Sequence, residues 1–456
     1  MRQAALAQGL PARFAWLSNP TLFLCIAGLV LPNALSLGAL IAGIGCPPRT
    51  GPILCYATVA MIARLAPAPA VIALYIAAAA YDAVSTIALL FGLSPSEIGL
   101  AIHLSGELKF FQSPLYMALI AGLTAVIAAN LVVLIFKRDA LKRGNPVVLF
   151  VLALALAAAD LAANTSPHYQ FGTLFGAGKP MDSAGEESGF RQAILAGKPK
   201  SVLLVVVEAM GEFHDPAKQD LLLQSFRNAD LLKRYDVSIG DATYYGSTTA
   251  AEMRELCNTR KSYLEVAKDD SIVCLPKLMD ERGYQTISLH NFTSAFFGRA
   301  DWYPKLGFEK RIFGQDLVGV SQRKCGGPFR GPCDVDLVPM IGKQLREAKK
   351  PTFFYWMTLS THVPIAPHEG TPRLGCEKNG GAIGHVEVCY MTEMWIDLLE
   401  SLVKMTADIP PTEILIVGDH APPLWSKAGR ELFAPGKVTW VRLKPRAQDK
   451  KVSRVR

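Results

Sequence analysis

Two different hydrophobic patterns divide the chain near residue 165. Before that point, long apolar stretches are separated by short polar loops, and we expect five of these stretches to cross a membrane. They are residues 20–45, 51–66, 70–92, 114–137 and 146–164. After about residue 200, short apolar runs alternate with helix-like segments. The expected fold is a multi-span α-helical membrane domain followed by an α/β domain with a mainly parallel central sheet.

The same patterns predict three parts. We assign residues 1–165 to a transmembrane domain of about five helices, 166–200 to a linker rich in Gly, Pro and Ser, and 201–456 to the α/β domain. Asp82 lies inside the third span, where burying a charge is costly. It is either a functional residue or a partner in a helix–helix hydrogen bond.

Charge predicts which way the chain crosses the membrane. Four Lys and Arg residues lie in the connection 137–143, which the positive-inside rule assigns to the cytoplasm. Arg2 and Arg13 assign the amino terminus to the same side. Both assignments hold if the number of spans is odd, and the α/β domain then lies outside the cytoplasmic membrane. We expect a multi-pass protein of the bacterial inner membrane with this domain in the periplasm.

Composition agrees with a membrane protein in an oxidising compartment. A hydrophobic content of 50% and a mean hydropathy of +0.24 exceed what a soluble protein of 456 residues needs. The net charge of +8 owes much to residues 437–456, which we interpret as a solvated face rather than a contact to anionic lipid, and we expect no nucleic-acid partner. Six cysteines of the α/β domain lie in sequence-near pairs, and proximity favours three disulfides over zinc clusters. The pairs are Cys257 with Cys274, Cys325 with Cys333, and Cys376 with Cys389.

Four expected strands end at side chains that can hold a metal or a phosphate. The runs and the residues that follow them are Ser201–Val207 with Glu208, Tyr284–Leu289 with His290, Thr352–Leu359 with His362, and Glu413–Gly418 with Asp419 and His420. Ligands of open α/β sheets gather at the carboxyl ends of the strands, so we expect these residues to converge. Glu, Asp and His together suit a divalent cation. A buried salt bridge at Glu208 and an Asx turn at Asp419 are the competing interpretations.

The segment Gly246–Met253 supplies hydroxyl groups where a turn becomes a helix. The amino terminus of a helix can hold a phosphate, and a nearby metal would lower the pKa of a hydroxyl. An ordinary Ser/Thr cap with a glutamate nearby is the alternative.

A set of motifs keeps the order of a known family over about residues 200–425. The motifs are Glu208, Thr248-Thr249-x-x-Glu252-Met253, His290-x(8)-Arg299, Tyr303-x-x-Leu306-Gly307-Phe308, Leu359–His362 and Gly418–His420. With them the chain resembles lipoteichoic acid synthase and its phosphoglycerol-transferase relatives in the alkaline phosphatase/sulfatase superfamily. Five amino-terminal spans also fit that family and the related lipid phosphoethanolamine transferases.

The resemblance implies a site with one divalent ion, which would be manganese, magnesium or zinc. Its implied ligands are Glu208, Thr248, Asp419 and His420, with Thr248 as the nucleophile and Thr249 as the alternative.

The resemblance also implies residues that contact the substrate. His290, Arg299 and His362 match positions that contact the donor's phosphate or glycerol, and His362 would protonate the leaving alkoxide. Phe297 stands where the synthases have tryptophan, which weakens the case for glycerol packing at this position.

The implied reaction moves phosphoglycerol from a membrane phospholipid resembling phosphatidylglycerol to an envelope glycan or lipid, through a phosphothreonine intermediate. A phosphoethanolamine transferase acting on lipopolysaccharide or another envelope acceptor is the alternative. The expected disulfides fit a Gram-negative periplasm, so we expect an acceptor other than lipoteichoic acid.

Overall fold

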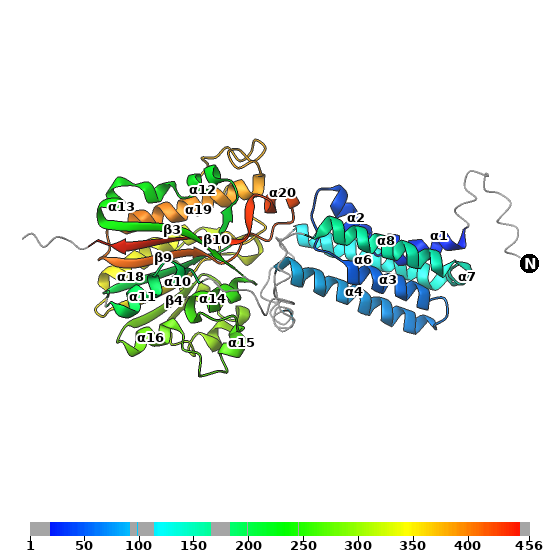
Figure 1. Ribbon diagram of the computed structural model, residues 1–456, viewed down its shortest axis with the longest axis horizontal. Coiled ribbons are helices and arrows are strands. Elements are labelled where there is room, and N and C mark those ends of the chain that lie inside the picture. Colours follow the sequence, from blue (N-terminus) through cyan, green and yellow to red (C-terminus); the bar gives the residue numbers. More distant parts are fainter. Residues whose placement is uncertain are drawn as a thin grey trace, which may run out of the picture. The chain divides into compact units, whose positions relative to one another are not determined.

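The computed structural model describes residues 19–91, 98, 114–165, 183–197, 199–244 and 246–446. These residues fall into two compact units (Figure 1). The first, which we call the apolar unit, holds the helices that precede Thr165. The second, which we call the sheet unit, holds the residues from Ser183 onward.

The described residues of the apolar unit are mostly helical. The helices are α1 Pro20–Cys25, the π-helical η2 Ile26–Val30, α2 Ala34–Ile41, α3 Thr50–Ile62, α4 Ala68–Phe91, α6 Pro114–Phe136, α7 Arg138–Arg143 and α8 Pro146–Asn164. Within the described residues, α4, α6 and α8 are long and apolar enough to cross a membrane. The pair formed by α1–η2 and α2 makes a fourth candidate, but it is bent by 69°. Helix α3 is shorter, so the count of five spans stays a prediction.

A polar cluster lies among these apolar helices. The Arg49 guanidinium donates to the Asp82 carboxylate at 2.8 Å and to the Asn33 side chain at 3.0 Å. The Tyr56 hydroxyl also donates to Asp82, at 3.0 Å. The main-chain N–H of Arg49 donates to Asp160 at 2.7 Å. Asp82 of α4 is therefore ion-paired with Arg49, the residue before α3, which offsets the cost of placing its charge among apolar helices.

Among the described residues, the sheet unit is built on an eight-stranded sheet with the order β2-β10-β9-β1-β8-β4-β5, and β3 also pairs with β10. Its strands are β1 Ser201–Val207, β2 Gly211–Phe213, β3 Tyr235–Thr243, β4 Gln285–His290, β5 Lys310–Phe313, β8 Thr352–Met357, β9 Thr412–Gly418 and β10 Phe433–Pro445. The five strands from β9 to β5 are parallel, whereas β10 is antiparallel to its neighbours. Strands β6 Lys324–Cys325 and β7 Gly331–Pro332 form a separate hairpin. The predicted fold class is confirmed.

The sheet is buried on both faces, as the side-chain alternation of its central strand requires. Along β1, Leu203, Val205 and Val207 belong to one hydrophobic core, and the residues between them belong to the other. The first core includes residues of α18 Asp334–Glu347 and α19 Val386–Met405. The second includes residues of α14 Thr248–Cys257 and α16 Leu275–Glu281. Helices therefore cover the sheet on both sides (Figure 1).

The remaining described helices are short. They are α10 Ala184–Glu187, α11 Phe190–Ala196, α12 Pro216–Leu222, η5 Gln224–Arg227, α13 Ala229–Arg234, α15 Tyr263–Val266, η6 Phe296–Gly298, α17 Arg299–Trp302, η7 Gly314–Leu317, η8 Gly327–Phe329 and α20 Lys427–Arg430. Helices α10 and α11 fall within the region that we assigned to the linker. Phe190 and Ile194 nevertheless pack fully buried in the second core, so this part of the region belongs to the sheet unit.

Two sequence expectations about this unit have clear outcomes. The three predicted cysteine pairs are bonded, at Cys257–Cys274, Cys325–Cys333 and Cys376–Cys389. The charged segment that we interpreted as a solvated face forms most of β10 over residues 437–445. Val438, Val441 and Leu443 are fully buried there, between the charged side chains that gave the segment its polar appearance.

Candidate metal centre

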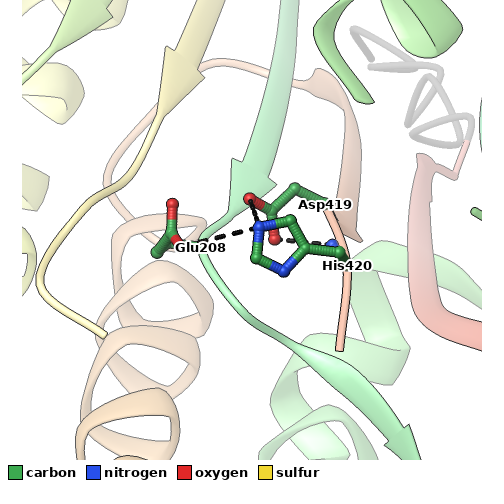
Figure 2. Close-up of side chains that lie close together, drawn as sticks. All are labelled: Glu208, Asp419 and His420. Carbon is green, nitrogen blue, oxygen red and sulfur yellow. Dashed lines mark hydrogen bonds and ion pairs between the residues drawn. The ribbon is translucent and has the colours of Figure 1, made fainter. Parts of the chain in front are cut away.

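Three metal-ligand candidates meet at the carboxyl ends of two neighbouring strands. Glu208 follows β1, and Asp419 and His420 follow β9. The two strands are parallel with Val207 opposite Gly418, so the residues that follow them lie side by side (Figure 2). The ligand atoms of the three side chains lie within 4.8 Å of one another. The His420 Nε2 atom is 3.9 Å from Glu208 Oε1 and 3.3 Å from Asp419 Oδ2.

Hydrogen bonds direct the free atoms of Asp419 and His420 toward one point. Asp419 Oδ1 accepts the main-chain N–H groups of Ala209 at 2.7 Å and of His420 at 2.6 Å, which leaves Oδ2 to face the centre. The Nδ1 atom of His420 lies 2.9 Å from the carbonyl oxygen of Ala421. Because a carbonyl can only accept, Nδ1 carries the proton and Nε2 presents a lone pair.

Hydrogen bonds also hold the main chain of Glu208 in place. Its N–H donates to the Thr358 hydroxyl at 2.8 Å, and its carbonyl oxygen accepts from the Thr361 hydroxyl at 2.6 Å and the Trp395 indole at 3.2 Å. These contacts fix the direction in which the Glu208 side chain leaves the strand.

The residues of the centre fit a divalent cation. Glu208 Oε1 is buried and has no hydrogen-bond partner among the described residues. Burial, and then the nearby Asp419 carboxylate, raise the pKa of Glu208 well above its ordinary value. A buried oxygen of this kind is stabilised by a cation, and two carboxylates with one imidazole suit manganese, magnesium or zinc. Glu208, Asp419 and His420 would hold the ion.

Thr248 brings a hydroxyl group to the same point. It is the first residue of α14, and its Oγ1 atom lies 3.0 Å from Asp419 Oδ2. The same atom is 3.4 Å from Glu208 Oε2 and 3.4 Å from His420 Nε2. Thr249 does not share this position, since its hydroxyl lies 3.1 Å from that of Ser247 and the residue is 1% exposed. Of the two threonines, only Thr248 directs its hydroxyl at the metal-ligand candidates.

His290 and His362 lie at the ends of the next two strands and share one protonation pattern. The Nδ1 atom of His290 lies 3.2 Å from the Met357 carbonyl oxygen, and that of His362 lies 2.8 Å from the Val363 carbonyl oxygen. Each Nδ1 is therefore the donor, and each Nε2 is left as an acceptor. Burial lowers the pKa of His362 to about 4 and that of His290 well below its ordinary value. Both rings are neutral near pH 7.

Arg299 and Phe297 lie deeper than the sequence suggested. Arg299 is 1% exposed, and its guanidinium is ion-paired with Glu252 at 2.8 Å. The Tyr303 and Tyr355 hydroxyls donate to the same carboxylate. The Arg299 charge acts on the centre from a distance, because it is among the groups that lower the pKa of His290 and of Glu208. The Phe297 ring is buried beside the Arg299 guanidinium, 5.6 Å from it.

Sequence reasoning missed Asp334, a buried carboxylate at the start of α18. It accepts from the main-chain N–H of Ser360 at 2.7 Å, from that of Leu359 at 3.2 Å, and from the Asn291 amide at 2.8 Å. Burial raises the pKa of Asp334 to about 6. The residue ties the end of β4 to the loop that carries His362. No motif marked it, because a lone Asp at a helix start is also a common cap.

Residues 200–386 match the family described as Sulfatase. The match agrees with the resemblance to the alkaline phosphatase/sulfatase superfamily over these residues. A search of the curated proteins found no match to the chain.

Several solved structures are similar to the chain. The lipoteichoic acid synthase LtaP from Listeria monocytogenes has 15% identity and a TM-score of 0.41, with 56% of this chain and 67% of that chain covered. The Streptococcus pyogenes phosphoglycerol transferase GacH, in complex with sn-glycerol-1-phosphate, has 16% identity and a TM-score of 0.39, with 57% and 73% covered. The lipooligosaccharide phosphoethanolamine transferase A (EptA) from Neisseria meningitidis has 14% identity and a TM-score of 0.45, with 96% and 89% covered.

Proposed function

We propose that the protein is a metal-dependent membrane transferase that moves phosphoglycerol from a membrane phospholipid to an envelope glycan or lipid. One observation carries this proposal: the Thr248 hydroxyl lies 3.0 Å from Asp419 and 3.4 Å from both Glu208 and His420. A divalent ion held by these residues would lower the pKa of that hydroxyl and neutralise charge on the phosphoryl oxygens.

In the first transfer, Thr248 Oγ1 attacks the phosphorus of the phospholipid. A bond forms between Oγ1 and phosphorus, and the bond from phosphorus to the diacylglycerol oxygen breaks. The products are diacylglycerol and a phosphothreonine diester that carries the head group. Thr248 loses its hydroxyl proton and the departing diacylglycerol oxygen takes up one proton, so the step balances. The position of Thr248 at the start of a helix favours the negative phosphate there.

In the second transfer, an acceptor hydroxyl attacks the same phosphorus and Thr248 leaves with a proton. The proton of the acceptor hydroxyl needs a base, and the bare Nε2 of His362 is one. The lowered pKa of His362 keeps it unprotonated near pH 7, so a base role fits it better than the acid role that the motif alone suggested. His362 returns the proton as the Thr248 oxygen departs.

The histidine protonation pattern bears on the donor head group. A bare Nε2 accepts hydrogen bonds, and a phosphate diester oxygen has no hydrogen to give. His290 therefore suits a hydroxyl of glycerol rather than the phosphate itself. The ammonium of ethanolamine is also a donor, so transfer of phosphoethanolamine to lipopolysaccharide or another envelope acceptor remains the second candidate.

The location follows from the charge pattern and the apolar helices. We propose a protein of the bacterial inner membrane whose sheet unit, residues 201–456 with the preceding short helices, faces the periplasm. A lipid donor and three disulfides both fit that compartment.

Labelled lipids test the donor. Purified full-length protein with Mn²⁺ or Zn²⁺ should release diacylglycerol faster from phosphatidylglycerol than from phosphatidylethanolamine. The opposite preference would replace phosphoglycerol by phosphoethanolamine and leave the chemistry of Thr248 intact. Release from neither lipid, by protein that binds metal, would contradict a phospholipid donor.

A further inference from the structure

A buried ion pair lies next to the metal centre but outside it. Arg254 and Glu255 are neighbours in α14, and the Arg254 Nε atom donates to Glu255 Oε1 at 2.6 Å. Their side chains are 3% and 0% exposed. Taking two charges out of water costs free energy that their mutual attraction often fails to offset, and an apolar pair of similar volume is frequently as stable. The pair therefore needs a reason beyond stability.

Arg254 holds the main chain of a metal-ligand candidate. Its Nη2 donates to the carbonyl oxygen of Gly418 at 2.8 Å, and its Nη1 to that of Asp419 at 3.2 Å. These carbonyls lie where β9 ends, and the Asp419 side chain points from there to the centre. The helix that carries Arg254 also begins at Thr248. Arg254 thus links the helix of the proposed nucleophile to the strand that supplies Asp419 and His420.

Glu255 holds a different segment. It accepts the Ser183 hydroxyl at 3.0 Å and the main-chain N–H groups of Ala184 at 3.2 Å and Gly185 at 3.1 Å. Ser183 is the first described residue after Thr165, so this segment opens the described part of the sheet unit, and we call it the entry segment. All of these groups are buried.

We propose that Arg254 is a positioning residue for the metal centre, and that Glu255 makes this positioning depend on the entry segment, Ser183–Gly185. The proposal rests on the metal site of the proposed function. Arg254 contacts the carbonyl group of Asp419 and not its carboxylate. It therefore acts on the position of this ligand rather than on the ion itself. Binding of a divalent ion and docking of the entry segment then stabilise each other reciprocally.

Replacing both members of the ion pair by uncharged residues tests the proposal in the full-length protein. The double variant Arg254→Met/Glu255→Gln removes one cation and one anion, so the net charge near the ion is unchanged. Arg254→Met alone would remove a positive charge beside a divalent cation and would by itself favour binding. We expect the double variant to bind Mn²⁺ or Zn²⁺ about 10- to 100-fold more weakly, measured by competition with a chelating dye.

The chain offers a matched control in Arg442→Met/Glu413→Gln. This pair is also largely buried, at 12% and 8% exposure, and Arg442 donates to the Ser188 carbonyl oxygen at 2.6 Å. It therefore anchors a residue near the entry segment to the sheet, through β10 and β9 rather than through the metal-ligand loop. We expect this control to leave metal affinity unchanged.

Amide hydrogen exchange provides a second test that does not depend on catalytic activity. Metal should slow amide exchange at Ala184 and Gly185 in the wild type, and it should do so less in Arg254→Lys, which keeps the charge but loses the forked contact to two carbonyls. If the wild type binds no metal, the proposed function itself fails. If the wild type binds metal and the Arg254 double variant binds it equally well, the positioning role is overturned. Equal losses of affinity in both double variants would also overturn it, as a general loss of stability.

Discussion

Replacing Glu208 by glutamine should stabilise the metal-free protein while destroying the metal site. Glu208 is 2% exposed, and its Oε1 has no hydrogen-bond partner among the described residues. Its pKa in the folded protein is raised, above all by burial and then by Asp419. In the absence of metal, the ionised carboxylate therefore opposes folding, whereas a glutamine of similar shape carries no charge. We expect the free energy of unfolding of metal-free Glu208→Gln to exceed that of the wild type.

The expected increase in the free energy of unfolding is small and depends on pH. A buried group left unsatisfied costs about 1–3 kcal/mol, of which the neutral amide should recover about 1 kcal/mol, or roughly 2–4 °C in melting temperature. A raised folded-state pKa means that the wild type is favoured at low pH and loses stability as pH rises from the unfolded pKa through the folded one. The advantage of Glu208→Gln should therefore grow between pH 5 and pH 8.

The assay is thermal unfolding of the full-length protein in detergent with chelator, repeated with added Mn²⁺ or Zn²⁺. Metal should raise the melting temperature of the wild type and leave that of Glu208→Gln unchanged. Asp336→Asn is the control, since the ion pair with Arg323 at 2.6 Å outweighs partial burial and lowers the pKa of Asp336, so this variant should be less stable than the wild type. If metal-free Glu208→Gln is also less stable, Glu208 is part of a structural ion pair and the reasoning is refuted.

Three further predictions follow from the site and the topology. Thr248→Ala should abolish transfer while the protein remains folded, at a cost of about 0.5–2 kcal/mol, and Thr249→Ala should remain active; the reverse result would reassign the nucleophile. His362→Ala should lower kcat about 10²- to 10⁴-fold with unchanged metal affinity in the dye assay, and a loss of metal binding instead would make His362 a ligand. A reporter fused near residue 175 should report the periplasm and one at Lys142 the cytoplasm, and the opposite pattern would remove a periplasmic lipid donor.

The parallel core of the fold could be predicted because its strands are buried on both faces. Such strands appear in the sequence as uninterrupted apolar runs, and β1 lies where the run Ser201–Val207 placed it. Strand β10 could not be recognised in this way, because it is an antiparallel strand whose buried Val438 and Val441 stand among charged residues. Helix α11 was missed because only Phe190 and Ile194 mark its buried face, and two positions do not establish a period.

The sequence could predict those residues of the site that directly follow a strand. Glu208 and Asp419 converge because parallel neighbouring strands end together, which follows from topology alone. The residues that orient them could not be found, because their role consists of contacts to main-chain atoms distant in sequence. Arg254 is one example, since its partners are carbonyl groups 164 and 165 positions away. The neutral state of His362 likewise depends on burial, which the motif does not encode.

The covalent intermediate on Thr248 is the central claim, and trapping it is the most direct test. Full-length protein with Mn²⁺ or Zn²⁺ would be mixed with phosphatidylglycerol in the absence of acceptor, stopped with acid and digested for peptide mass spectrometry. We predict a phosphoglycerol group on Thr248, formed together with diacylglycerol and absent when chelator is added. Release of diacylglycerol with Thr248 unmodified, or with the group on another residue, would contradict the account.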